Sequence, residues 1–203
     1  MSTSLLDSAW SERLGRLEEL LKRPDLVSQI SKHQGMPYAL FPYPPTAERE
    51  VRKEVRLLAT RVRQQSGREV VILSMAELLW KVLDQLPPGR SLFDLERKMA
   101  SWEPRRRLEK VQETILNALT ERGTLHRLIA EPLAGKDPER TVAFLTRVGA
   151  LYPVYRASTL LDNLESDVRV PVILFYPGTR SGTNSLRFMD SLDALHSYRH
   201  KIY

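Results

Sequence analysis

Two apolar runs that flank a helical pattern limit the fold of this chain more than any other feature. The first run is Thr141–Thr146 and the second is Val170–Tyr176. Both are short and rich in β-branched or aromatic residues, which is typical of strands buried on both faces of a sheet. The segment between them, from Pro153 to about Leu164, has the apolar spacing of an amphipathic helix. A strand, a crossover helix and a second strand predict a parallel pairing.

The rest of the chain adds strands and helices to this unit. We expect further strands at residues 36–43, at 69–73 and, as a last edge strand, at 198–203. Pro42 lacks a backbone N–H, so it should lie at the end of its strand or at the sheet edge. Helices are expected at residues 8–23, at 46–67 with Thr46 as N-cap, at 74–86 with Ser74 and Glu77 as a capping box, and at 186–195.

Residues 90–135 interrupt this alternation with helical patterns alone, opened by caps such as Ser91 and by Pro104 near a helix start. The segment is too long for an ordinary crossover, so we interpret it as a helical insertion packed on one side of the sheet. The chain, residues 1–203, is therefore expected to form a single three-layer α/β domain. It should contain a mainly parallel sheet of four to five strands flanked by helices, with N-terminal helices in residues 1–35.

Charge and cysteine content limit the function. The net charge is +6 and the pI is about 9.7, which favours contact with nucleic acid or an acidic protein surface. The chain has no cysteine, which excludes disulfides, thiolate zinc sites and cysteine nucleophiles. It also lacks an apolar run of the length that crosses a bilayer, and its first residues do not resemble a signal peptide. We expect a cytoplasmic protein without membrane contact.

No catalytic, cofactor or metal site is predicted. The carboxyl ends of the strands, where ligands collect in open parallel sheets, should present Tyr43, Ser74, Thr146, Arg147 and Tyr176. A glycine-rich loop between a strand and a helix is missing, so a degenerate nucleotide-binding site is only the weaker alternative. The loop 178–183 is open to two interpretations, an anion cradle or a mobile loop. His126 has no Ser or Asp neighbour in the sequence that suggests a triad.

Two groups of side chains are candidates for binding macromolecules. The most basic stretch of the sequence supplies a candidate nucleic-acid surface: Arg97, Lys98, Trp102, Arg105, Arg106 and Arg107. The alternative interpretation is that these are ordinary solvated helix faces. A candidate protein-partner surface consists of aromatic and arginine side chains near the crossover and one arginine of the later loop: Arg147, Tyr152, Tyr155, Arg156 and Arg180. The alternative interpretation is that the aromatic side chains pack in the core.

The motifs around the crossover resemble the BrxB family. The segment Val142–Pro153, followed by Leu160–Leu164, is similar to the family pattern in which a VFLTGVG strand leads into a Tyr-Pro turn. Val170–Gly178 is similar to its closing VPVVMFYPG element. The resemblance extends to the helix Trp10–Leu21, the aromatic-proline strand Tyr38–Pro44 and the strand and helix Val70–Leu83. Arg147 stands where the family pattern has a small residue.

This resemblance implies a component of a BREX bacteriophage-exclusion system. Such systems combine an adenine methyltransferase, a large ATPase and PglZ, a protein that resembles alkaline phosphatases. The resemblance implies a non-enzymatic adaptor or scaffold without a cofactor. It makes PglZ the main expected partner, with the methyltransferase, the ATPase and DNA as further ones. The alternative is a direct DNA-binding module of the same system that uses the basic helical surface.

Overall fold

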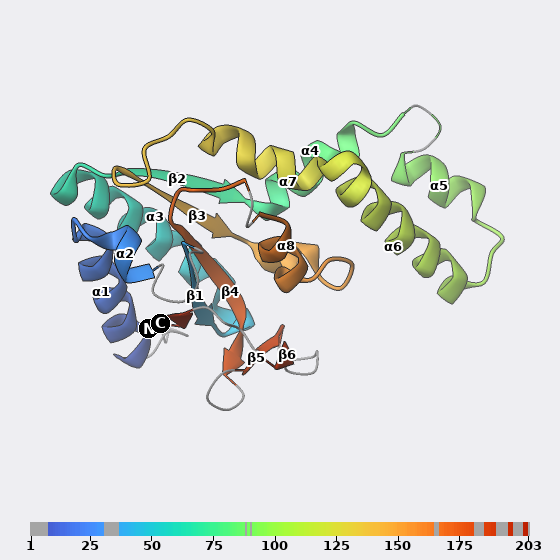
Figure 1. Cartoon of the computed structure of the whole chain (residues 1–203). Coiled ribbons are helices and arrows are strands. Elements are labelled where there is room, and N and C mark those ends of the chain that lie inside the picture. The colour runs from blue at the N-terminus through green and yellow to red at the C-terminus, as the bar shows by residue number, and fades with distance from the viewer. Residues whose placement is uncertain are drawn as a thin grey trace.

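In the computed structural model, a parallel sheet has the strand order β2-β3-β4-β1-β7 (Figure 1). The strands in that order are Glu69–Ser74, Thr141–Thr146, Val172–Arg180, Tyr38–Tyr43 and Lys201–Ile202. The structure describes residues 8–30, 37–87, 89, 91–164, 167–180, 185–189, 195–196 and 201–202. The predicted mainly parallel sheet of four to five strands flanked by helices is confirmed.

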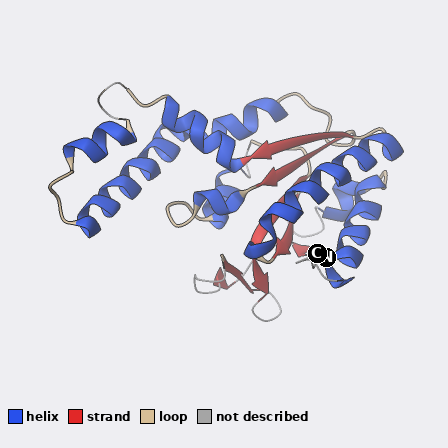
Figure 2. Ribbon diagram, turned by 180° about the vertical axis from the view of Figure 1, so that it is seen from behind, coloured by secondary structure: helices blue, strands red, loops and turns tan. Residues whose placement is uncertain are grey.

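Helices cover both faces of the sheet. One face is covered by α1 (Ser8–Lys22), α2 (Leu26–Ile30) and α3 (Glu48–Ser66), and α3 lies in front of the strands in Figure 2. The other face is covered by α4 (Met75–Asp84), α7 (Thr124–Ala130), α8 (Ala157–Leu164) and the C-terminal end of α6 (Pro104–Thr120). The two sets of helices make two separate cores, one on each face of the sheet, so the fold has three layers.

The alternation of side chains along β3 explains its unbroken apolar sequence. Val142 and Phe144 pack against the helices α1–α3, whereas Ala143 and Leu145 pack in the core on the opposite face. Since successive side chains of a strand point to opposite faces, a strand covered on both sides needs apolar residues at every position. The same holds along β4.

A buried arginine closes the amino end of the sheet. Arg68, just before β2, donates hydrogen bonds from its guanidinium group to the backbone oxygens of Leu21 at 3.1 Å, Arg23 at 2.8 Å and Glu139 at 2.5 Å. These bonds tie the end of α1 and the segment before β3 to β2. Because its donors are satisfied by carbonyl groups, the charged side chain is tolerated with only 5% of its surface exposed.

Pro42 lies inside β1 at the open side of that strand. Within the described residues, β7 pairs with β1 at Ala39 and Leu40 and not at Pro42. The Pro42 carbonyl instead accepts a hydrogen bond of 2.6 Å from Arg13 of α1. The N and O atoms of one strand residue point to the same side, so the proline nitrogen faces away from β4 and no ladder bond is lost. The predicted edge position is confirmed.

Two of the three predicted helix caps are correct. Ser74 accepts a hydrogen bond of 3.4 Å from the backbone N–H of Glu77, and Ser91 accepts one of 3.1 Å from that of Asp94. The prediction for Thr46 is wrong. Thr46 lies inside a 3-10 turn, η1 (Pro45–Ala47), and α3 begins after it at Glu48 without a side-chain cap.

The C-terminal prediction of a helix at 186–195 is also wrong for the residues described. β4 continues past Pro177 to Arg180, where a loop was expected, and β5 (Ser185–Phe188) pairs with it antiparallel. β6 (Leu195–His196) then pairs with β5. Gly178 permits this approach, because a Cβ atom there would lie 2.1 Å from the Arg187 carbonyl oxygen. Residues 181–184 of the predicted loop lie outside the described residues.

The helical insertion is confirmed, but only part of it packs on the sheet. Its described residues form α5 (Leu92–Lys98), α6, η2 (Glu121–Gly123), α7 and η3 (Glu131–Leu133), with no strand among them. The end of α6 and α7 contribute to the core, whereas α5 and the beginning of α6 extend away from the body at the right of Figure 1. Across the described parts of the chain, no helix is long and apolar enough to cross a membrane.

Candidate functional site

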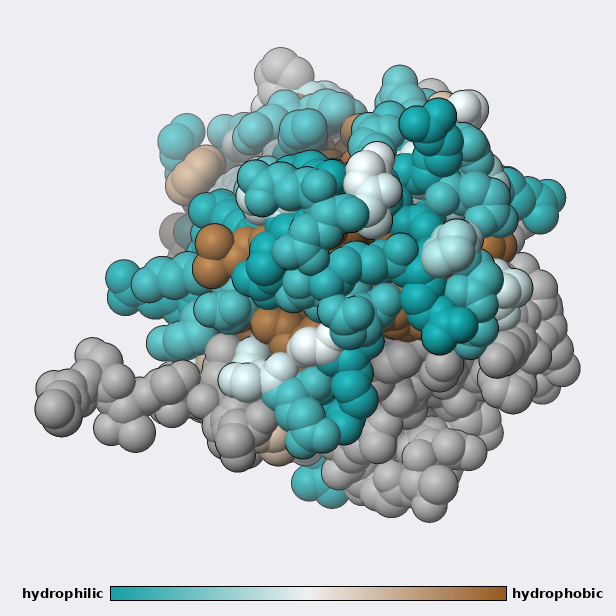
Figure 3. Space-filling model, turned by 90° about the vertical axis from the view of Figure 1, so that its left-hand side faces the viewer, coloured by the Kyte–Doolittle hydropathy of each residue, from teal (hydrophilic) through white to brown (hydrophobic). Residues whose placement is uncertain are grey.

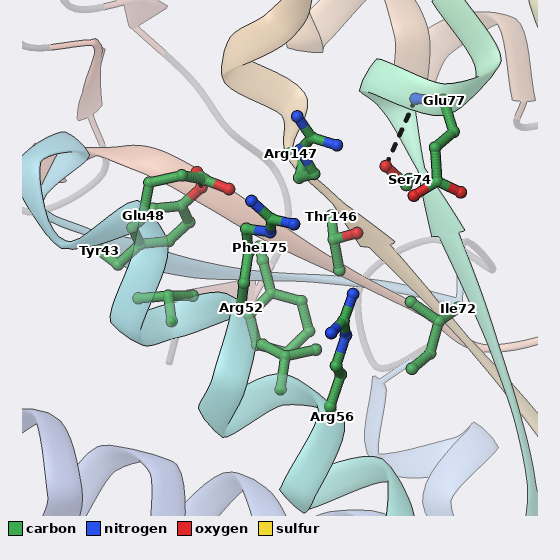
Figure 4. Close-up of a pocket in the computed structure, with 12 residues that line it drawn as sticks. Tyr43, Glu48, Arg52, Arg56, Ile72, Ser74, Glu77, Thr146, Arg147 and Phe175 are labelled. Carbon is green, nitrogen blue, oxygen red and sulfur yellow. Dashed lines mark hydrogen bonds between the residues drawn. The ribbon is translucent and has the colours of Figure 1, made fainter.

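A pocket of about 220 Å³ lies at the carboxyl ends of the parallel strands (Figure 4). Tyr43 at the end of β1, Ser74 at the end of β2, and Thr146 with Arg147 at the end of β3 all line it. The prediction that these residues meet at one edge is therefore confirmed. Tyr176 was expected there as well, but it is buried in the core on the opposite face.

The wall of this pocket opposite the sheet is the helix α3. Arg52 and Arg56 extend from α3 toward the end of β3, where Thr146 and Arg147 lie (Figure 4). The pocket thus combines three guanidinium groups from two elements that are distant in the sequence. Within the described residues, none of the three forms an ion pair or a side-chain hydrogen bond.

One of the two acidic residues that line the pocket is held by a tyrosine. The buried Tyr43 hydroxyl donates a hydrogen bond to the Glu48 carboxylate. Burial raises the pKa of Tyr43 far above its ordinary range, and the Glu48 charge and hydrogen bond raise it further, while Arg147 opposes them. Tyr43 therefore stays a neutral donor and occupies one lone pair of Glu48. The other acidic lining residue is the exposed Glu77.

The residues predicted as a protein-partner surface have different environments. Arg147 lines the pocket and Arg156 is exposed. Tyr152 is half-buried, with its ring centroid 6.0 Å from that of Phe188. Tyr155 is only 6% exposed, and its hydroxyl accepts a hydrogen bond of 2.8 Å from Asn163, so it belongs to the core. Arg180 is the last residue of β4, and its side chain lies outside the described part of the structure.

The residues predicted as a nucleic-acid surface all lie in residues 91–120, the pair of helices α5 and α6, which we call the helical hairpin. Arg97 and Lys98 belong to α5, Trp102 lies in the connection, and the arginines 105–107 begin α6. All are exposed except Arg107, which is half-buried. The Arg106 guanidinium carbon stacks 4.5 Å from the centroid of the Trp102 ring.

Three of the six basic residues of the helical hairpin pair with a carboxylate on their own helix. Its sequence has six Lys or Arg residues and five Asp or Glu residues, a formal charge of +1. Arg97 lies 4.0 Å from Asp94, Arg105 lies 3.5 Å from Glu109, and Lys110 forms a 2.8 Å pair with its neighbour Glu113. Each of these pairs joins residues three or four positions apart, which are neighbours on a helix surface.

Sequence reasoning missed the exposed apolar side chains of the helical hairpin. Phe93 is 78% exposed and Leu108 is 58% exposed, and Leu116 and Trp102 are exposed as well. These are four of the six large exposed hydrophobic side chains among the described residues; the other two are Leu57 and Trp80. By contrast, the side of the molecule formed by α1–α3 is mainly hydrophilic (Figure 3).

The protein-family model described as "BREX protein BrxB" matches residues 71–202, which is more than half of the chain. The chain belongs to the BrxB family. The matched range contains the helical hairpin and the β3–α8–β4 crossover, whose motifs carry the resemblance in the sequence. As a BrxB-family protein, the chain is a component of a BREX antiviral defence system.

Two curated BrxB proteins resemble most of the chain. A BREX protein BrxB of Bacillus cereus (strain H3081.97) is 26% identical over 185 residues, which cover 88% of this chain and 91% of that protein. A BREX protein BrxB of Escherichia coli O9:H4 (strain HS) is 21% identical over 183 residues, covering 89% of this chain and 84% of its own length. No solved structure matches the chain.

This BrxB-family chain also has one histidine–carboxylate pair that sequence reasoning overlooked. His126 Nε2 of α7 lies 3.0 Å from Asp167 Oδ2, a neighbour that is 41 residues away in the sequence. α7 packs on the face opposite α3, so the pair is not part of the pocket. In the described ranges of the chain, no three His, Cys, Asp or Glu side chains form a group able to hold a metal ion.

Proposed function

We propose that this chain is a non-enzymatic adaptor that binds PglZ through the helical hairpin and links it to the methyltransferase and DNA in a BREX complex. The observation that carries this proposal is the apolar surface that the hairpin exposes away from the body. The identity of the partner in this proposal comes from the family membership. The choice of the binding surface comes from the structure.

The uncovered apolar stripe of α6 is the first argument. Leu108, Val111, Ile115 and Leu119 recur at helical spacing on one face. At the body end of the helix, Leu119 is 2% exposed, whereas at the far end Leu108 is 58% exposed. Exposed apolar area costs about 25 cal/mol per Å². Because the apolar stripe of α6 continues beyond the part that the protein's own core covers, a partner that covers the rest would gain this energy.

The residue types around this stripe are the second argument. Interface centres are enriched in aromatic residues and arginine, and hot spots are most often tryptophan, tyrosine or arginine. The hairpin exposes Phe93, Leu108 and Leu116, and its exposed Trp102 ring stacks with Arg106. Its formal charge is only +1, so it lacks the strong positive charge that binding to a phosphate backbone needs. The arrangement therefore suits a protein more than a phosphate backbone.

Direct DNA binding by the same hairpin is the second candidate. The exposed ring of Trp102, stacked on Arg106, favours it, because nucleic-acid interfaces use such pairs against bases and phosphates. The local charge of +1 argues for weak binding, since affinity for duplex DNA grows with the number of phosphates neutralised.

Co-purification with tagged PglZ, before and after nuclease treatment, tests the adaptor proposal. We expect the wild-type chain to stay bound after nuclease, and the Phe93→Ala/Leu108→Ala variant to bind at least about tenfold more weakly. Leu57→Ala, an exposed leucine on α3, is the matched control and should bind like wild type. Loss of PglZ on DNA digestion, or equal weakening by Leu57→Ala, would refute the adaptor proposal.

The DNA candidate has its own measurement. If the hairpin binds duplex DNA, the logarithm of the affinity should fall linearly with the logarithm of the salt concentration. Replacing Arg105, Arg106 and Arg107 with alanine should then make this slope shallower by up to about three. A flat salt dependence, or a slope that the triple variant leaves unchanged, would eliminate this candidate.

A further inference from the structure

We propose that the pocket between α3 and the carboxyl ends of the strands binds a phosphate group, either free or as the monoester of a small organic molecule. The site is separate from the helical hairpin, so it does not depend on the adaptor proposal. The inference starts from its position, since the carboxyl ends of strands in an open parallel sheet are where ligands bind in this class of fold. Here α3 follows the carboxyl end of β1 and leads to β2, which lies at the opposite end of the strand order. The chain then continues to β3, the neighbour of β2.

The charges of the pocket select an anion. Arg52, Arg56 and Arg147 line it, and no described carboxylate pairs with them. Of the two acidic lining residues, Glu48 already accepts the hydrogen bond of Tyr43. Guanidinium groups bind phosphate and carboxylate with paired hydrogen bonds, and three of them match a phosphate group of nearly two negative charges better than a single carboxylate.

The backbone at Arg147 is the second, independent observation. Arg147 has a φ of +57°, a left-handed conformation that favours glycine and is unfavourable for a side chain with a Cβ atom. Strained backbone conformations of this kind cluster at functional sites, which supports a role for Arg147 in the pocket that it lines. Ser74 adds a neutral donor, because its oxygen accepts from the Glu77 N–H and its own O–H remains available to a ligand.

The size and walls of the pocket limit what is attached to the phosphate. A volume of about 220 Å³ is below the range of about 300–1,000 Å³ for sites of drug-sized ligands, so a dinucleotide does not fit inside it. The half-buried Ile72 and the side chains of Val55 and Phe175 provide apolar walls. These features suit inorganic phosphate or a single nucleoside monophosphate whose base lies against the apolar wall.

Isothermal titration of the full chain with inorganic phosphate, at constant ionic strength in chloride, is the test. We expect saturable binding that weakens at least about tenfold in Arg52→Gln/Arg56→Gln and in Arg147→Gly. Arg147→Gly is the informative variant, because glycine relieves the left-handed conformation and should keep or raise the melting temperature while it removes the charge. Arg49→Gln, an exposed α3 arginine outside the pocket, is the control for net charge.

A second titration with adenosine monophosphate separates the two sources of the phosphate. Tighter binding than that of inorganic phosphate assigns the apolar wall to a base, and equal affinity assigns the site to the phosphate group alone. Absence of saturable phosphate binding by the wild type would overturn the proposal, as would a loss in Arg49→Gln equal to that in Arg147→Gly. PglZ binding should be unchanged in Arg52→Gln/Arg56→Gln, since neither arginine belongs to the helical hairpin or to the candidate protein-partner surface. The two proposals can therefore fail separately.

Discussion

The sheet and the helical hairpin contain the same types of residue in opposite environments. Phe144 in β3 is fully buried, whereas Phe93 in α5 is 78% exposed. Arg68 is buried with its donors bound to three carbonyl groups, whereas Arg106 lies on the surface against Trp102. The difference shows that residue type alone does not reveal whether a side chain stabilises the fold or is available to a partner. Its burial in the structure does. We infer that the sheet supplies the stability of the fold and that the hairpin is kept free for a partner.

The phenylalanine pair gives the largest expected effect. Phe144→Ala should lower the free energy of unfolding by about 3–5 kcal/mol, because it removes a buried ring and leaves a cavity. Phe93→Ala should change it by no more than about 0.5 kcal/mol, because the ring is in water already. Urea denaturation of both variants measures this. If Phe93→Ala destabilises the chain as much as Phe144→Ala, the hairpin is part of the core and the comparison fails.

The arginine pair tests the same contrast for a charged side chain. Arg68→Met should cost about 2–4 kcal/mol of unfolding free energy, because it leaves the carbonyls of Leu21, Arg23 and Glu139 without their donor. Arg106→Met should be nearly neutral, since the side chain is exposed. Thermal denaturation of the two variants measures this difference as a difference in melting temperature. Equal melting temperatures would show that Arg68 is not a structural residue.

Ion pairs give the smallest expected effect. They compare a partly buried pair in the body of the protein with an exposed pair on the hairpin. Glu18 of α1 accepts a 2.7 Å hydrogen bond from Arg61 of α3. Burial raises the pKa of Glu18, but hydrogen bonds from Arg61 and Lys22 outweigh it and leave the pKa below its ordinary value. A lowered pKa in the folded state stabilises the fold above the unfolded pKa of about 4.3, and this stabilisation is lost as the pH falls through the folded pKa.

Glu18→Gln should therefore be less stable than wild type at pH 7, by no more than about 1 kcal/mol because Arg61 is partly exposed. The difference should shrink as the pH falls below about 4. Glu109→Gln, which removes the exposed partner of Arg105 on the hairpin, is the matched control and should change the free energy of unfolding at pH 7 by no more than about 0.5 kcal/mol. A Glu18→Gln difference that grows in acid would mean that the sign of the pKa shift is wrong.

The parallel sheet could be predicted because its signals are local. β3 was found to the residue, since burial on both faces makes every position from Thr141 to Thr146 apolar or small. β5 was missed because its pairing is not local. It forms beside β4 only where Gly178 lets two backbones approach, and nothing in Ser185–Phe188 itself distinguishes a strand from a short helix.

The candidate sites were predictable to different degrees. The strand-end residues of the pocket could be found from the sequence, because parallel strands end at one edge. Arg52 and Arg56 could not, because the whole outer face of α3 is charged and the sequence does not reveal which part lies over the strand ends. The exposure of Leu108 was hidden in the same way. Helical periodicity identifies an apolar stripe, but it does not say how far the protein's own core covers it.

Hydrogen–deuterium exchange of the chain, alone and bound to PglZ, tests the central claim most directly. We predict slower exchange in the helical hairpin, residues 91–120, on binding, with little change in β3, whose amides are already protected by the sheet. Unchanged exchange throughout the hairpin, with new protection on the α1–α3 face or at the pocket instead, would contradict the claim that the hairpin is the partner-binding surface.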